Sequence, residues 1–301
     1  MRTATQEAPN KIVNILERTV FISIRFSRFG NSKKVSASQV DVDADKKRIR
    51  VSKRLLESEE LLKIVRLDHE SRSYVESRCL PYEKGVHVLP FGLVEEVEAE
   101  LRDYERRREV LIDGFIEKYP ELIEEATKPL GVLFKESDYL SPSQARAEYS
   151  MRWNYLTFST PDNLRELAPG FYARESAKFE AKLSESYEEW RSILRVAMAD
   201  LVKRLAESLK PDPDGKTKKL TESSVTKLDE FLSTFSFRNV TDDAELEKIC
   251  SQVRDVMKGI TVGKLRESES LRASAGEKIA KAAATLEVMT QGLRKIRADE
   301  D

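Results

Sequence analysis

The sequence has few residues that break or cross-link a chain: 11 glycines, 10 prolines and two cysteines among 301 residues. Scarce glycine and proline, combined with 35% charged residues, favour long helices with solvated outer faces. Cys79 and Cys250 stand far apart and in no spaced motif, which excludes a disulfide framework and suits a reducing compartment. No apolar run approaches the length of a membrane-spanning helix, and the first twenty residues hold no apolar signal core. We therefore expect a cytoplasmic protein without a membrane segment.

Sequence motifs of the common enzyme classes are missing as well. There is no Gly-rich phosphate loop, no GxSxG, no HExxH and no CxxC. The two histidines, His69 and His87, have no third ligand at metal-binding spacing. Acidic pairs such as Glu95-Glu96 carry no information among 53 acids. We expect no enzymatic activity, and therefore no catalytic residue, metal or cofactor.

Charge is distributed unevenly along the chain, although the formal net charge is only −1. From Lys11 to Arg54, twelve Lys and Arg stand against four Asp and Glu, a net charge of +8. Residues 1–10 are neutral overall, so residues 55–301 carry −9. A basic N-terminal region joined to an acidic body is typical of a protein that meets a polyanion.

The basic region has the alternating pattern of β-strands. In residues 20–26 apolar side chains alternate with polar ones, which predicts a half-buried strand that ends by Gly30. The segment SQVDVDADKKRIRVSKR predicts two short strands around a turn at 43–47, with the facing residues Val40, Val42, Ile49 and Val51. A sheet this small must rest on a helix, and residues 55–77 have helical spacing of leucines.

In the chain after the basic region, apolar residues recur mostly at helical spacing and form apolar seams along one helix face. The fold class that we predict is therefore mainly α with a small N-terminal β unit (α+β). The longest helices are expected at about 91–127 and 170–210, as an antiparallel hairpin of coiled-coil-like arms. The predicted units are a basic β unit (1–54), a long-helix body (55–210) and C-terminal helices (211–301). The loop PDPDGKTKKLTESS precedes the last unit, where a helix over 242–258 would be capped by Thr241 or Asp242.

An aromatic cluster lies between the two long helices, within residues 133–161. Its members are Tyr139, Tyr149, Trp153 and Tyr155. Ser141-Pro142 predicts a short helix over 142–149, and residues 152–158 predict a strand, so Trp153 and Tyr155 should differ in burial from Asn154. Two interpretations remain open: a buried hub where helices meet the sheet, or a platform for a nucleobase or a partner peptide.

Two segments of the chain carry a resemblance to a known family. LPFGLVEEVEAELRDYERRREVLIDGFIEKYPELIEEA and PLGVLFKESDYLSPSQARAEYSMRWNYLTFSTPDNLRE are similar to the bacterial and phage domain-of-unknown-function family numbered 3150. The landmarks are Phe115 and Tyr119, the Leu133-Phe134 and Asp138-Tyr139 pairs, and Pro161; Leu140 departs from the proline expected there. The likeness covers about residues 20–210, implies a genomic neighbourhood with a MoxR-type AAA+ ATPase and a von Willebrand A protein, and supplies no catalytic residue.

These patterns favour a non-enzymatic helical adaptor or assembly subunit, which associates with itself or with an AAA+ ATPase. The alternative is single-stranded DNA binding through the basic β unit, with phenylalanines that alternate with arginine on the first strand. A third reading of the same cations is a guarded sheet edge or a dock for an acidic protein. The residues predicted to contact nucleic acid are Phe21, Arg25, Phe29, Lys33, Lys34, Lys46, Lys47, Arg48, Arg50, Lys53 and Arg54.

Overall fold

The computed structural model describes residues 15–41, 45–159, 163–210 and 222–291. The chain is mainly α-helical with a small β unit near the N-terminus, which confirms the predicted fold class. The strands are β1 (Thr19–Ser27), β2 (Ser32–Val35), β3 (Val51–Arg54), β4 (Leu80–Glu83), β5 (Val86–Pro90) and β6 (Ser150–Leu156). The helices are α2 (Glu59–Arg78), α3 (Val94–Leu130), α4 (Pro142–Ala147), α5 (Asn163–Leu167), α6 (Pro169–Leu209), α7 (Glu222–Arg238), α8 (Ala244–Met257), α9 (Val262–Glu267) and α10 (Glu269–Thr290).

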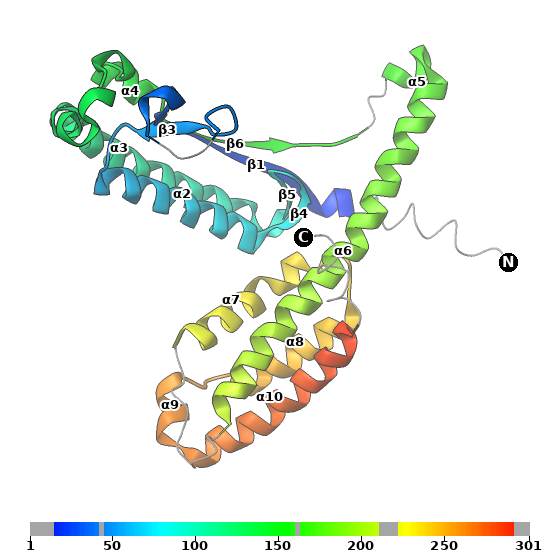
Figure 1. The fold of residues 1–301 in the computed structure, drawn as a ribbon. Helices are drawn as coiled ribbons and strands as arrows, with labels where there is room; N and C mark the ends of the chain where they lie inside the picture. Colours follow the sequence, from blue (N-terminus) through cyan, green and yellow to red (C-terminus); the bar gives the residue numbers. More distant parts are fainter. Residues whose placement is uncertain (1–14, 42–44, 160–162, 211–221, 292–301) are drawn as a thin grey trace.

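Figure 1 shows two lobes. In the sheet lobe, α2 and α3 lie beside the strands; in the helical lobe, α7 to α10 surround the C-terminal half of α6. The main sheet has four strands in the order β4-β5-β1-β6, and every neighbouring pair is antiparallel. β1 is therefore central, with partners that come from far along the chain.

The sheet separates two apolar cores. On one face, Ile22 and Ile24 of β1 pack with Val97 and Leu101 of α3 and with α2. On the other face, Phe21 packs near the β4 end of the sheet with apolar residues of α6. A third core joins the far end of α3 to α4 and to the chain around Leu55. Because side chains alternate along β1, this strand contributes residues to the cores on both faces of the sheet.

The two long helices have the predicted extents but different partners from the predicted ones. α3 pairs with α2, and ion pairs between Arg78 and Glu96 and between Lys118 and Glu60 show that the two run antiparallel. α6 pairs with α10, where Arg272 donates to backbone carbonyls at the end of α6. The hairpin of α3 with α6 is not formed, because each apolar seam is covered by a helix whose own pattern is less regular.

The N-terminal β unit is also divided differently from the prediction. β2 pairs with β3, and Val35 lies opposite Val51. The hydroxyl of Ser36 accepts from the amide of Ser38 and begins a 3-10 turn over Ala37–Gln39, so the chain leaves the strand before Val40. Residues 42–44, which include the predicted strand residue Val42 and the start of the predicted turn, lie outside the described residues. Since β1 belongs to the main sheet, the boundary predicted at residue 54 does not separate the strands from the helical body.

Candidate interaction site

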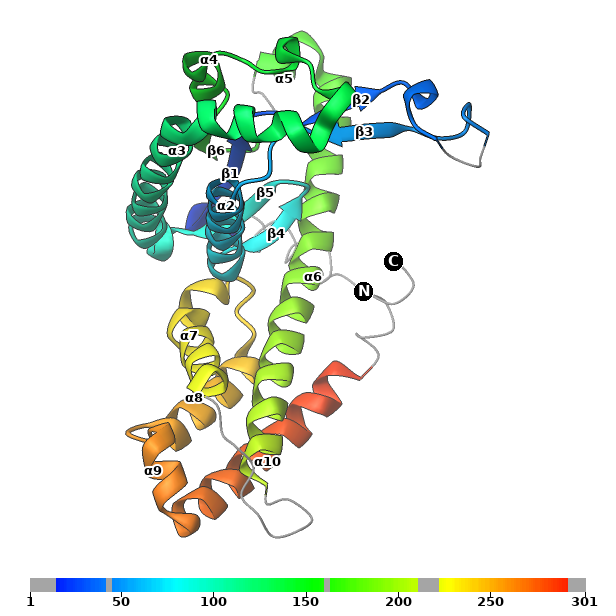
Figure 2. The ribbon, with the colours of Figure 1, turned by 60° about the vertical axis from the view of Figure 1, so that its left-hand side comes forward.

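Most of the predicted nucleic-acid-binding cations lie on the β2–β3 ribbon and its tip. Figure 2 shows this ribbon projecting from the sheet lobe. Its exposed cations are Lys33, Lys34, Lys46, Lys47, Arg48 and Arg50. Within the described part of the chain, Arg48 is the member of this set that forms an ion pair, with Asp45 at 3.9 Å. These six exposed cations make the ribbon a strongly basic surface.

Two other predicted cations are already occupied by acids of this chain. Lys53 is buried, and its ammonium lies 2.5 Å from a carboxylate oxygen of Asp138 and donates to the carbonyl of Leu133. Arg54 is exposed and pairs with Glu57 at 3.2 Å. Lys53 as a ligand-binding residue is thus a wrong prediction: it anchors the ribbon to the chain that follows α3.

The two phenylalanines cannot stack on bases. Phe21 is 2% exposed and packs edge-on against Tyr82 and Phe158. Phe29 is 6% exposed and packs against Tyr119. Their prediction as a stacking platform is wrong, because both side chains serve the cores on which the small sheet depends.

Arg25 lies near the C-terminal end of β1. It stands directly opposite Arg152 of β6, and both side chains are exposed. Neither has an ion pair with any residue in the described ranges. Like charges directly opposite each other on one sheet face are destabilising. This pair therefore forms an unneutralised cationic patch, which the sequence could not show because β1 and β6 are more than a hundred residues apart.

The two edges of the main sheet are protected very differently. The β4 edge contains Pro81, an irregular register between Pro81 and Glu83, and a backbone carbonyl bonded by the indole of Trp190. β6 pairs with β1 over seven consecutive residues without a shift, and its outer side has no strand partner in the described chain. Proline and bulges are two of the means by which proteins block strand edges, and β6 has neither, although the exposed Arg152 places a charge on it.

Trp153 and Tyr155 lie on the helix-facing side of β6 and share one acceptor. The indole N–H and the phenol O–H donate to the same Glu98 oxygen, at 2.7 and 2.9 Å. Burial alone would raise the pKa of Glu98, but the hydrogen bonds from Trp153, Tyr155 and Arg102 lower it. The predicted alternation is present, since Asn154 points to the other face; the burial contrast holds for half-buried Trp153 but not for Tyr155, which is 38% exposed.

The other two aromatics of the predicted cluster lie elsewhere. Tyr149 is buried in the third core against Phe115, and Tyr139 packs beside Phe134 and donates to the carbonyl of Leu55. The four aromatics therefore divide between two places. Tyr139 and Tyr149 are part of a core, and Trp153 and Tyr155 border the open strand edge.

A buried ion-pair network joins α2 and α3 to the C-terminal end of β1, and it was not predicted from the sequence. Asp68 of α2 and Arg108 of α3 are both 1% exposed, and Arg108 Nε lies 2.7 Å from a carboxylate oxygen of Asp68. Arg28 donates to the other Asp68 oxygen, and Arg108 also donates to the carbonyl of Ser27. In the sequence, Arg108 stands as a polar residue among the apolar positions of α3, and this is the signal that could have pointed to the network. The network fixes the end of β1 against both helices.

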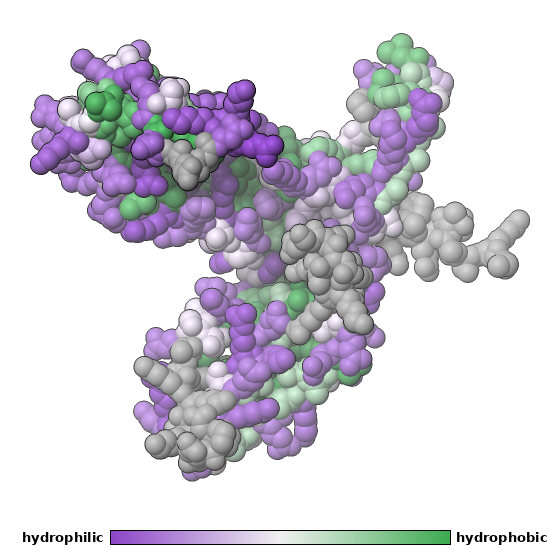
Figure 3. All heavy atoms as spheres, viewed as in Figure 1, coloured by the Kyte–Doolittle hydropathy of each residue, from purple (hydrophilic) through white to green (hydrophobic). Residues whose placement is uncertain are grey.

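The start of α6, from Pro169, forms an arm together with α5. Figure 1 shows this arm standing clear of both lobes. From Pro169 to Lys182 no residue of the helix is buried. At the tip, Leu167 is 80% exposed and Phe171 is 45% exposed, and the tip is hydrophobic in Figure 3. Exposed apolar side chains gathered at the tip of a projecting helix are the kind of surface that marks protein association.

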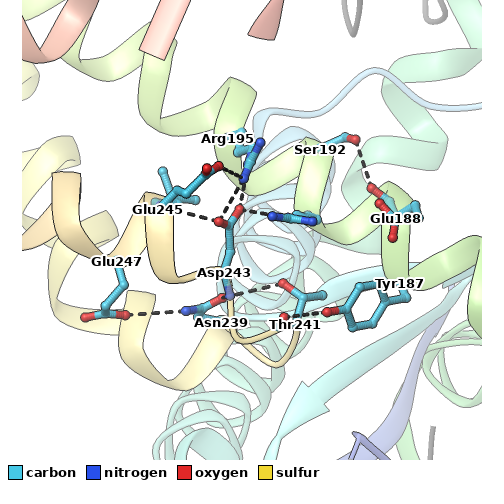
Figure 4. Close-up of polar contacts among 11 residues, drawn as sticks. Tyr187, Glu188, Ser192, Arg195, Asn239, Thr241, Asp243, Glu245 and Glu247 are labelled. Atoms are coloured by element: carbon cyan, nitrogen blue, oxygen red, sulfur yellow. Dashed lines mark hydrogen bonds and ion pairs between the residues drawn. The ribbon is translucent and has the colours of Figure 1, made fainter. Parts of the chain in front are cut away.

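The helical lobe is tied together by a buried carboxylate at the start of α8. Asp243, with its side chain out of water, accepts from Arg195 at 2.6 and 2.9 Å and from Arg191 at 3.2 Å. It also caps α8 by accepting from the amide of Leu246. The N-cap is therefore Asp243, one position after the predicted Asp242 and two after the predicted Thr241. Figure 4 shows Asp243 and Asn239 as neighbours, with Asn239 accepting from the Asp243 amide. Asp243 therefore joins α6 to the start of α8.

Further features of the described residues concern metal-type clusters, a surface hollow and the two cysteines. Among them no three His, Cys, Asp or Glu side chains gather as a metal site. A hollow of about 750 Å³ opens between α7, α8 and the start of α9, with Arg254, Asp255 and Lys258 among its lining residues. Burial raises the pKa of both cysteines to about 12, which makes their thiols inert.

Comparisons with protein-family models, with curated proteins and with solved structures find no match for this chain. Across the described ranges, no helix combines the length and apolarity that membrane crossing demands. The chemistry of the surfaces described above is therefore the basis for assigning a function.

Proposed function

We propose that this protein is a helical interaction or assembly subunit without a catalytic reaction of its own. The observation that carries this proposal is the α5–α6 arm, with Leu167 and Phe171 exposed at its tip and no buried residue from Pro169 to Lys182. A free helix of this kind gains stability by packing on another surface rather than from its own propensity. The partner is a second copy of the chain or, as the family resemblance suggests, an AAA+ ATPase.

Replacing Leu167 and Phe171 together by aspartate is expected to abolish association through the arm. Both side chains are solvent-exposed, so the free energy of unfolding should change by less than about 0.5 kcal/mol for each. The measurement is mass photometry of the chain alone, and co-purification with an ATPase encoded beside it. Val132→Asp is the control, because Val132 is 90% exposed but lies outside the arm. Association that survives the double change would contradict the proposal.

A second candidate function, binding of single-stranded nucleic acid, is favoured by the projecting basic ribbon. Its exposed cations can reach phosphates without leaving water, and Arg25 with Arg152 adds a second cationic patch on the sheet. With Phe21 and Phe29 buried, such binding would depend on the phosphate backbone and would show little base preference.

Oligonucleotide binding, if present, should weaken steeply with salt, with a log–log slope of about −0.7 for each phosphate contact. Reversing Lys46, Lys47, Arg48 and Arg50 to glutamate should abolish it without unfolding the protein, since the four are exposed. Fluorescence anisotropy with a labelled single strand measures both effects. The matched control reverses exposed cations of the helical lobe: Lys203, Arg204, Lys227 and Lys248. No binding at low salt, or equal loss in the control, would remove this candidate.

A further inference from the structure

β6 is the edge strand of the main sheet, and among the described residues no strand pairs with its outer side. Its seven residues pair with β1 without a bulge, so alternate backbone N–H and C=O groups along the outer side point away from the sheet. In the described residues no strand satisfies them, whereas the β4 edge is protected by Pro81 and by α6. An added strand would use these groups for main-chain hydrogen bonds, which is the mechanism of strand addition.

The two faces beside this edge differ in chemistry and so select the added side chains. On the helix-facing side, half-buried Trp153 and 38%-exposed Tyr155 offer apolar ring surface. On the opposite side, Arg152 with Arg25 behind it offers two positive charges without a counterion in the described chain. Because side chains of a strand alternate between faces, the fitting segment has apolar residues at every second position and acidic residues between them.

Residues 40–45 of this chain have that alternation. They read Val-Asp-Val-Asp-Ala-Asp, with three apolar and three acidic positions in strict alternation. The pattern is a strand signal, yet Val40 and Asp41 belong to no strand in the structure, and residues 42–44 lie outside the described residues. In the sequence, this segment stands between β2 and β3, whose ribbon projects from the sheet lobe in Figure 2.

We infer that residues 40–45 of one copy add as a strand to the β6 edge of a second copy, with the aspartates against Arg152 and Arg25. Such a contact joins two different surfaces and is therefore a head-to-tail contact, which builds a ring or a filament. The inference rests on the proposed role as an assembly subunit, but it uses a surface separate from the α5–α6 arm. It also gives the like-charged Arg25–Arg152 pair a use that offsets its cost.

Charge exchange tests the inference with full-length protein. Arg152→Glu should weaken self-association by about tenfold or more, because acid would then face acid, and Asp41→Arg with Asp43→Arg should do the same from the other side. Arg152→Glu leaves folding intact, since it turns a repulsive cross-strand pair into an attractive one. A chain that carries all three changes, or a mixture of the two variants, should recover association. Mass photometry and sedimentation measure each case.

A peptide probe distinguishes strand addition from simple charge attraction. A labelled peptide of residues 38–46 should bind wild-type protein and the Asp41→Arg/Asp43→Arg variant, and should bind Arg152→Glu about tenfold more weakly. The same peptide with N-methylated alternate amides keeps its charges but loses backbone donors, so it should not bind. Equal binding of the methylated peptide would overturn the strand-addition model.

The outcomes also separate this inference from the arm proposal. Self-association that is lost with Leu167→Asp/Phe171→Asp but unchanged in Arg152→Glu would overturn the β6 contact and leave the arm proposal standing. Loss with Arg152→Glu and recovery in the charge-exchanged chain would support the β6 contact whatever the arm does. A wild-type protein that stays monomeric at all concentrations and does not bind the peptide would overturn it.

Discussion

Asp68→Asn is expected to lower the free energy of unfolding by on the order of 3–5 kcal/mol. The substitution keeps the side-chain volume but removes the negative charge that faces Arg108, and both residues are 1% exposed. An uncompensated guanidinium would then remain buried between α2, α3 and β1, and half-buried Arg28 would lose the same partner. Chemical denaturation monitored by tryptophan fluorescence and by circular dichroism measures the change.

The control for this prediction lies on the same helix. Glu70 pairs with Arg107 at 3.6 Å, but both side chains are about half exposed, so Glu70→Gln should cost less than about 1 kcal/mol. Replacing Asp68 and Arg108 together by Leu and Met should restore much of the loss, because no buried charge remains. An Asp68→Asn protein within 1 kcal/mol of wild type would show that the network is hydrated in solution.

Local patterns predicted the fold where a single element decides it. The alternation in residues 20–26, the Ser141-Pro142 start of α4 and the extents of α3 and α6 are all found in the structure. Each of these elements depends on the spacing of apolar residues and on the capping residues within one segment, and both can be read from the sequence. The four-stranded sheet could not be predicted, because β1 finds its partners at 86–90 and 150–156 and nothing local encodes that choice.

The pairing of the long helices failed for a related reason. An apolar stripe along one face of a helix indicates that the helix packs against another element, but it does not indicate which element. The seam of α3 is covered by α2, whose leucines are spaced less regularly, and α6 is covered by α10, whose small residues allow a close approach. Arg108 is a polar residue among the apolar positions of α3, but its partner Asp68 lies forty positions away in the sequence and stands in no distinguishing pattern.

The candidate site was predicted in part. Exposure of the ribbon cations follows from their charge, and the structure agrees for six of them, from Lys33 to Arg50. The prediction that Phe21 and Phe29 face a ligand is wrong because a large aromatic side chain in or next to a small sheet contributes more to stability when it is buried in the core. Arg152 and the open edge of β6 were not predicted at all, since an edge exists only once the strand order is known.

Asp243→Asn is expected to cost the helical lobe on the order of 3–5 kcal/mol. Asparagine can still cap α8 through its side-chain oxygen, so the change removes the charge and keeps the cap. Arg195, which is largely buried, and Arg191 would lose the carboxylate that joins α6 to α8. Asp242→Asn is the neighbouring control: asparagine tolerates the left-handed backbone there (φ 49°), and the Arg18–Asp242 pair is exposed, so less than about 1 kcal/mol should be lost.

The pH dependence of unfolding provides an independent measurement of the same contact. Burial alone would raise the pKa of Asp243, but the hydrogen bonds from Arg195, the Leu246 amide and Arg191 outweigh it and lower the pKa from 3.8 to about 2. Because the folded state binds this proton more weakly than the unfolded state, the contribution is fully present above about pH 4 and is lost as the pH falls towards 2. Asp243→Asn should therefore be destabilised at neutral pH and should lose part of the acid sensitivity of the wild type. A parallel pH profile in the two proteins would mean that Asp243 titrates normally and that the arginines are satisfied by water.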